Sequence, residues 1–104
     1  MSEERTFPTA NGQLRVVIDD DVAQGVYSNL QMVSSSDAEF VIDFLYLPPT
    51  RERARVRSRA ILNPRRAKAL HQMLAQQLAA YEARFGEIPP PPVPPKADGG
   101  GILN

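Results

Sequence analysis

One stretch decides the fold: residues 63–86, which read NPRRAKALHQMLAQQLAAYEARFG. Asn63 and Pro64 indicate a helix start, because Asn caps free N–H groups and Pro at the first helical position has no N–H to lose. Good helix formers fill the stretch, and Gly86 is a typical helix stop. The apolar residues share one helical stripe: Ala67, Leu70, Leu74, Leu78, Tyr81 and Phe85. The stretch predicts one long helix whose apolar face needs a surface to cover.

The sequence before this helix alternates between apolar and polar residues, which is typical of strands with one buried face. We expect strands over residues 13–19, 26–33, 39–47 and 53–62, of which the third, EFVIDFLYL, has the strongest pattern. The connections between the later strands are short, so these strands are expected to be antiparallel. The prediction is an α+β fold: a four-stranded antiparallel β-meander with one long C-terminal α-helix packed on one face, the face of Phe40 and Phe44.

The chain is expected to hold a single α+β domain over residues 13–88. Residues 1–12 lack periodicity and contain Pro8, which favours a flexible N-terminal segment. Residues 89–104 contain six prolines and three consecutive glycines, which favours a disordered Pro/Gly-rich tail. The N-terminus lacks the apolar region of a signal peptide and no apolar run is long enough to cross a bilayer. We therefore expect no membrane association and a cytoplasmic location.

No residues show the spacing of a catalytic or metal site. The chain has no Cys and a single His, His71, which is too little for a zinc site. The acidic triplet at residues 19–21 lacks the alternating ligands of a calcium loop. A catalytic His71 would need a nucleophile and an orienting acid, which its sequence neighbours do not suggest. The expectation is a protein that is not an enzyme, with no catalytic residue, no cofactor and no metal.

The net charge of zero conceals a strong asymmetry. Residues 1–50 carry two basic and eight acidic side chains, whereas residues 51–104 carry ten basic and four acidic ones. Such asymmetry can indicate a nucleic-acid or other anionic partner. We favour mutual neutralisation of the two halves, within one chain or across a dimer, because dedicated nucleic-acid-binding domains carry a net basic charge.

An alternating row of arginines is the most unusual feature of the basic half. In a regular strand, alternate residues project from one face about 6.8 Å apart. The candidate anion-binding residues are Arg53, Arg55, Arg57, Arg59, Arg65, Arg66 and Lys68. No aromatic residue is interleaved, so base stacking is not supported. We favour pairing of the row with Asp43 and Glu39 on the adjacent strand. Nucleic-acid or polyanion binding through residues 51–68 is the alternative, and protection of an exposed sheet edge is a third interpretation.

Self-association is expected because a domain this small buries a limited part of its surface. A second apolar cluster on the sheet face opposite the helix indicates an interface. The candidate interface residues are Val17, Tyr27, Val33, Val41, Leu45 and Ile61. The function predicted from the residues is a non-enzymatic protein-interaction or adaptor module that forms a homodimer or higher oligomer and binds an unidentified protein partner.

Four segments together resemble a known sequence family: VAQGVYSN at residues 22–29, EFVIDF at 39–44, SRAILNP at 58–64, and YE with FGEI between 81 and 88. Over about residues 18–88 the chain is similar to an uncharacterised family of small bacterial proteins, known only as a domain of unknown function. The resemblance implies a bacterial source and a shared fold, and it implies no activity.

Overall fold

The computed structural model of the 104-residue chain describes residues 2–91 and 102–103. Its elements follow in the order β1 (Ser2–Thr9), β2 (Gly12–Asp19), α1 (Asp20–Ala23), β3 (Leu30–Ser35), β4 (Phe40–Tyr46), β5 (Arg55–Leu62), α2 (Pro64–Phe85) and β6 (Ile102–Leu103). Strands β1 and β2 form a two-stranded antiparallel sheet. Strands β3, β4 and β5 form a second antiparallel sheet, which the two residues of β6 extend at its β3 edge. The fold class α+β is confirmed, but the single four-stranded meander is wrong.

Strand β4 lies at the centre of the second sheet, as its apolar sequence predicts. Val33 of β3 and Ala60 of β5 are both cross-strand partners of Ile42, so all three share the face from which α2 starts. The other face carries Asp43 and Leu45, the buried side chains of the described residues. A core of this size is very small for a chain of 104 residues.

The N-terminal residues form a strand that the sequence analysis missed. Ser2–Thr9 pairs with Gly12–Asp19 through a two-residue connection, instead of forming an irregular lead-in. Glu4 pairs with Arg15 across the strands, with 2.7 Å between Oε1 and Nε. The strand was missed because its residues are mostly polar and do not alternate with apolar ones. The Asn11-Gly12 turn signal marks the connection, and Gly12 has the positive φ of 128° that favours glycine.

Helix α2 has the predicted ends. The side chain of Asn63 accepts a hydrogen bond from the backbone N of Arg66 at 2.8 Å, and Pro64 occupies the first turn. At the other end Gly86 has a φ of 98°, and its N–H donates to the carbonyl of Glu82 at 2.9 Å. These caps stabilise the free backbone groups at both helix ends.

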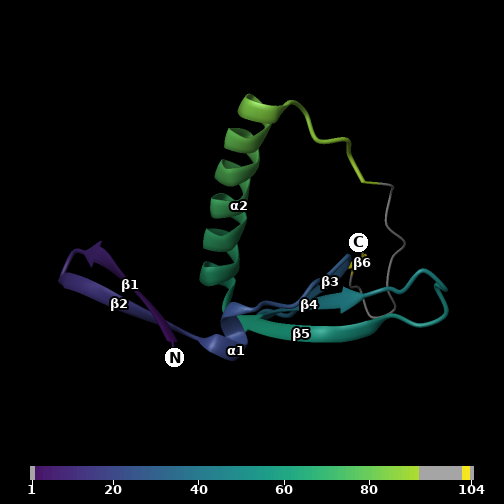
Figure 1. Cartoon of the computed structure of the whole chain (residues 1–104), viewed down its shortest axis with the longest axis horizontal. Helices are drawn as coiled ribbons and strands as arrows, with labels where there is room; N and C mark the ends of the chain where they lie inside the picture. Colours follow the sequence, from purple (N-terminus) through teal and green to yellow (C-terminus); the bar gives the residue numbers. More distant parts are fainter. Residues whose placement is uncertain (1, 92–101, 104) are drawn as a thin grey trace.

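The position of α2 differs from the prediction. Figure 1 shows the helix standing away from the second sheet instead of lying across it. The reason is the connection: β5 ends at Leu62 and α2 begins at Pro64, which is shorter than the two to six residues usual between a strand and a helix that packs back on it. Only the first turns of α2 therefore lie beside the sheet, and α2 has no buried residue.

The predicted tail falls mostly outside the described residues, since residues 92–101 and 104 are not part of the description. Residues 86–91 follow α2 without helix or strand and are exposed. Ile102 and Leu103 are cross-strand partners of Val33 and Met32.

Candidate functional site

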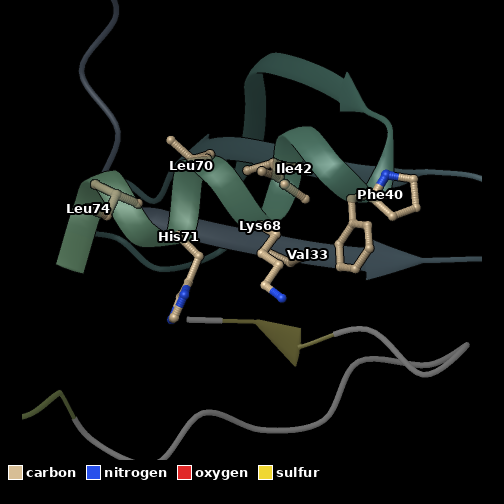
Figure 2. Close-up of a pocket in the computed structure, with 9 residues that line it drawn as sticks. Val33, Phe40, Ile42, Lys68, Leu70, His71 and Leu74 are labelled. Atoms are coloured by element: carbon tan, nitrogen blue, oxygen red, sulfur yellow. The ribbon is translucent and has the colours of Figure 1, made fainter. Parts of the chain in front are cut away.

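An apolar groove of about 610 Å³ lies where α2 leaves the sheet (Figure 2). The sheet contributes Val33, Phe40 and Ile42 to its lining. The helix contributes Pro64, Ala67, Lys68, Leu70, His71 and Leu74. Lys68 and His71 project from α2 to the same side of the helix. The groove can accept apolar side chains, with a cationic group from Lys68 among its walls.

The apolar stripe of α2 continues beyond the groove into solvent. The exposed fractions are 53% for Leu74, 49% for Leu78, 51% for Tyr81 and 65% for Phe85. The rings of Tyr81 and Phe85 contact each other with centroids 4.9 Å apart, and the guanidinium of Arg84 lies 5.2 Å from the centroid of Phe85. The helix thus presents leucines along its middle and an aromatic pair at its C-terminal end, and the described residues leave all of them exposed.

The predicted pairing of the arginine row with the acidic half occurs at one position. Nε and one terminal nitrogen of Arg59 donate to the two carboxylate oxygens of Asp43 at 2.6 and 3.1 Å. The Arg59 hydrogen bonds lower the pKa of Asp43, although burial opposes this effect. Asp43 is 2% exposed, so the pair fixes a charge in the small core through two-point geometry. Glu39, the other predicted partner, forms no ion pair within the described part of the chain.

The arginines do not form one regular row. Strand β5 begins at Arg55, which leaves Arg53 in the preceding loop. A register shift beside Phe44 and Leu45 places Arg55 opposite Tyr46, whereas Arg59 is opposite Asp43. Because Asp43 and Tyr46 are three residues apart, they face opposite sides of the sheet. The extra residue of a β-bulge produces this break, and nothing in the alternating sequence reveals it.

The other candidate anion-binding residues are exposed. Arg65, Arg66 and Lys68 lie in the first turns of α2, next to the end of β5. None of these three residues has an ion pair among the described residues, and the same holds for Arg53, Arg55 and Arg57. Arg59 is the exception. The structure therefore brings basic side chains together at the junction of β5 and α2 without neutralising them there.

The candidate interface residues are not on one surface. Val41, Leu45 and Ile61 share the face of Asp43, since Val41 and Ile61 are cross-strand partners; Leu45 belongs to the buried core. Val33 is opposite Ile42 and lines the groove, so its predicted placement on the face away from the helix is wrong. Register decides the face of a strand residue. The remaining two residues lie elsewhere: Val17 in the β1–β2 hairpin and Tyr27 in the loop before β3.

A second, smaller pocket lies at the end of the sheet near Tyr27. It has a volume of about 430 Å³ and is lined by Tyr27, Asn29, Tyr46, Leu47, Pro48, Pro49 and Arg51. The Asn29 side chain donates to the carbonyl of Leu47 at 2.9 Å and accepts from the N–H of Leu47 at 2.8 Å. These two hydrogen bonds hold the wall of the pocket in place. The sequence analysis missed this pocket, although it singled out Tyr27 and the segment 22–29 that contains Asn29.

Two features are absent from the described residues. No group of three or more His, Cys, Asp or Glu side chains there is placed to hold a metal ion. Among the same residues, no helix combines the length and hydropathy required to cross a bilayer.

The chain matches a known family of sequences. A family model described as "Protein of unknown function (DUF3467)" matches residues 1–89. The match starts earlier than the resemblance at residues 18–88 and so includes the β1–β2 hairpin. No curated protein and no solved structure matches the chain. Because the family model covers most of its length, the chain belongs to the DUF3467 family of proteins of unknown function.

Proposed function

We propose that the protein is a non-enzymatic protein-interaction module that acts as a homo-oligomer. The observation that carries the proposal is the exposure of the α2 stripe, in which Leu74, Leu78, Tyr81 and Phe85 are all about half exposed or more. A contiguous apolar surface of this kind marks an interface in a soluble protein. Self-association is the simplest way to cover it, since every copy carries the same stripe.

The energetics of a single chain support this proposal. Residues 71–81 of α2 are all exposed, and a helix gains most of its stability from packing of its apolar face. The β1–β2 hairpin extends away from the second sheet in Figure 1, and an isolated two-stranded hairpin is marginal in water. Both elements require contacts beyond those that residues 2–91 and 102–103 supply.

The exposed area leads to the same conclusion. The whole chain exposes 9069 Å², whereas a compact monomer of 11.5 kDa is expected to expose about 5,800 Å². The difference is larger than the surface of about 800 Å² that each partner buries in a standard interface. The excess is therefore large enough to include a standard dimer interface.

An adaptor role for the oligomer rests on the β1–β2 hairpin. Phe7 and Leu14 are cross-strand partners and are exposed on one face of the hairpin, on an element separate from α2 (Figure 1). This second apolar surface is available to a protein partner when the helices are covered. The cytoplasmic location and the bacterial source stay predictions; fractionation of native cells tests the location.

Sedimentation equilibrium of the full chain tests the proposal. We expect a mass at least twice 11.5 kDa at micromolar concentration, and a mass of a single chain throughout would contradict it. Substitution of Leu78 by Glu should shift the equilibrium towards the single chain, because a charge cannot be buried there without a partner. Substitution of Gln76 by Glu is the control, since residue 76 lies on the opposite side of the helix.

Polyanion binding is a second candidate function. It is favoured by the exposed basic side chains of Arg65, Arg66 and Lys68 at the junction of β5 and α2, which have no ion pair among the described residues. Phosphate contacts make affinity fall steeply with salt. Titration with double-stranded DNA at low and physiological salt tests this candidate. A steep loss with salt that Arg66→Gln reduces and Arg84→Gln does not would support it; no binding at low salt would exclude it.

A further inference from the structure

We infer that the groove between α2 and the sheet is filled by the aromatic pair Tyr81 and Phe85 of a second copy of the chain, with the two α2 helices antiparallel. This inference rests on the proposed self-association and specifies its geometry. The interface would be isologous, so each copy would contribute one groove and one aromatic pair.

The groove cannot be filled by the aromatic pair of its own chain. Phe85 lies 15 residues after Leu70, which corresponds to a separation of about 22 Å along a helix. The helix is continuous from Pro64 to Phe85, and its direction away from the sheet is set by the one-residue connection at Asn63. The aromatic pair is therefore held far from the groove of the same chain, since the C-terminal end of α2 stands away from the second sheet (Figure 1).

A two-fold axis beside Leu78 brings the two surfaces together. In an antiparallel pair of helices, residues whose numbers add up to the same total lie opposite each other. With Leu78 opposite its own copy, Phe85 of the second copy lies beside His71, and Leu74 lies near Glu82. His71 and Leu74 are both lining residues of the groove. The stripe thus ends, on each copy, at the position where the other copy has its groove.

The chemistry of the two surfaces is complementary. The groove walls are mainly aliphatic and aromatic, with Phe40 and Leu70 among them, and the Tyr81–Phe85 pair is exposed. Burial of aromatic side chains dominates the energy of many interfaces. The antiparallel arrangement also brings Glu87 of the second copy towards Lys68. In the described part of the chain neither Lys68 nor Glu87 has an ion pair, so the contact would join opposite charges at the rim.

Cysteine cross-linking tests this geometry on a clean background, because the chain has no Cys. Full-length Leu78→Cys should form a disulfide-linked dimer in a glutathione redox buffer. Separately purified Val33→Cys and Phe85→Cys chains, one carrying a mass tag, should form a mixed disulfide when incubated together. Gln76→Cys is the matched control on the opposite side of α2 and should not cross-link, since a disulfide requires Cα atoms within about 7 Å.

The outcomes separate the geometry from the proposed function. Cross-links through residue 78 and between residues 33 and 85, without one through residue 76, would support the inference. A multiple of 11.5 kDa in sedimentation with neither cross-link would overturn the antiparallel geometry and leave self-association standing. A single-chain mass for the wild-type protein would overturn both. Circular dichroism of each variant shows whether it keeps its helix, and the Leu78→Cys result stands independently of any loss of affinity in Phe85→Cys.

Discussion

Substitution of Leu78 by Ala should weaken the dimer by a measurable amount that the structure allows us to calculate. Leu78 is 49% exposed in the single chain, so about half of its side chain remains to be buried on association. Full burial of a leucine is worth about 1.5–3 kcal/mol, which gives about 0.7–1.5 kcal/mol for each copy. A symmetric dimer loses this contribution twice, about 1.5–3 kcal/mol in total, which corresponds to an increase in Kd of about 10- to 150-fold.

The assay is sedimentation equilibrium over a range of protein concentrations, with the wild-type chain and Gln76→Ala measured in parallel. Gln76→Ala should leave Kd within about fivefold, because surface changes away from contacts have effects within about 0.5 kcal/mol per copy and the dimer carries the change twice. Helicity measured by circular dichroism at saturating concentration shows that the fold is kept. A Leu78→Ala protein with the wild-type Kd would refute the reasoning, since Leu78 would then lie outside any interface.

Two further predictions concern the fold itself. Substitution of Asn63 by Ala removes the helix cap that accepts from the N–H of Arg66, and it should lower the free energy of unfolding by about 0.5–2 kcal/mol. In urea unfolding, Asn63→Asp should retain most of the wild-type stability because Asp also caps helices. Equal losses in the two variants would contradict the capping role. The Arg59 hydrogen bonds hold the pKa of Asp43 below the ordinary value of 3.8, so the stabilisation by this carboxylate is present above the unfolded-state pKa and is lost as the pH falls through the lower folded-state pKa. The urea midpoint of Asp43→Asn should therefore fall less at acid pH than that of the wild-type protein. The same dependence of the urea midpoint on pH in both proteins would contradict this prediction.

The elements with strong periodicity or clear caps could be predicted from the sequence. Strand β4 and helix α2 agree with their predicted positions to within one or two residues, because an alternating apolar strand and a capped apolar stripe each satisfy local rules. Pairing of the arginine row with Asp43 was also predicted; of the row, Arg59 makes this pair, because the two residues are cross-strand partners in adjacent strands.

The arrangement of those elements could not be predicted in the same way. The apolar stripe of α2 shows that the helix needs a surface to cover it. The sequence pattern of the stripe is the same whether that surface is the sheet of its own chain or a second copy. Strand β1 was missed because Glu3, Glu4 and Arg5 give no apolar alternation; it pairs with β2 through its backbone, with the exposed ion pair of Glu4 and Arg15 across the two strands. The groove was missed because it depends on the one-residue connection between β5 and α2.

Hydrogen exchange of the backbone amides of α2 tests the central claim most directly, namely that a second copy covers the exposed stripe. Exchange measured by mass spectrometry reports the opening free energy of each segment. We predict that peptides covering residues 71–85 exchange slowly at high protein concentration and faster on dilution, whereas peptides from β4 change less. Rapid exchange of residues 71–85 at every concentration would contradict the account, because the helix would then have no partner; slow exchange that does not depend on concentration, in a protein of single-chain mass, would show that the chain covers its own stripe.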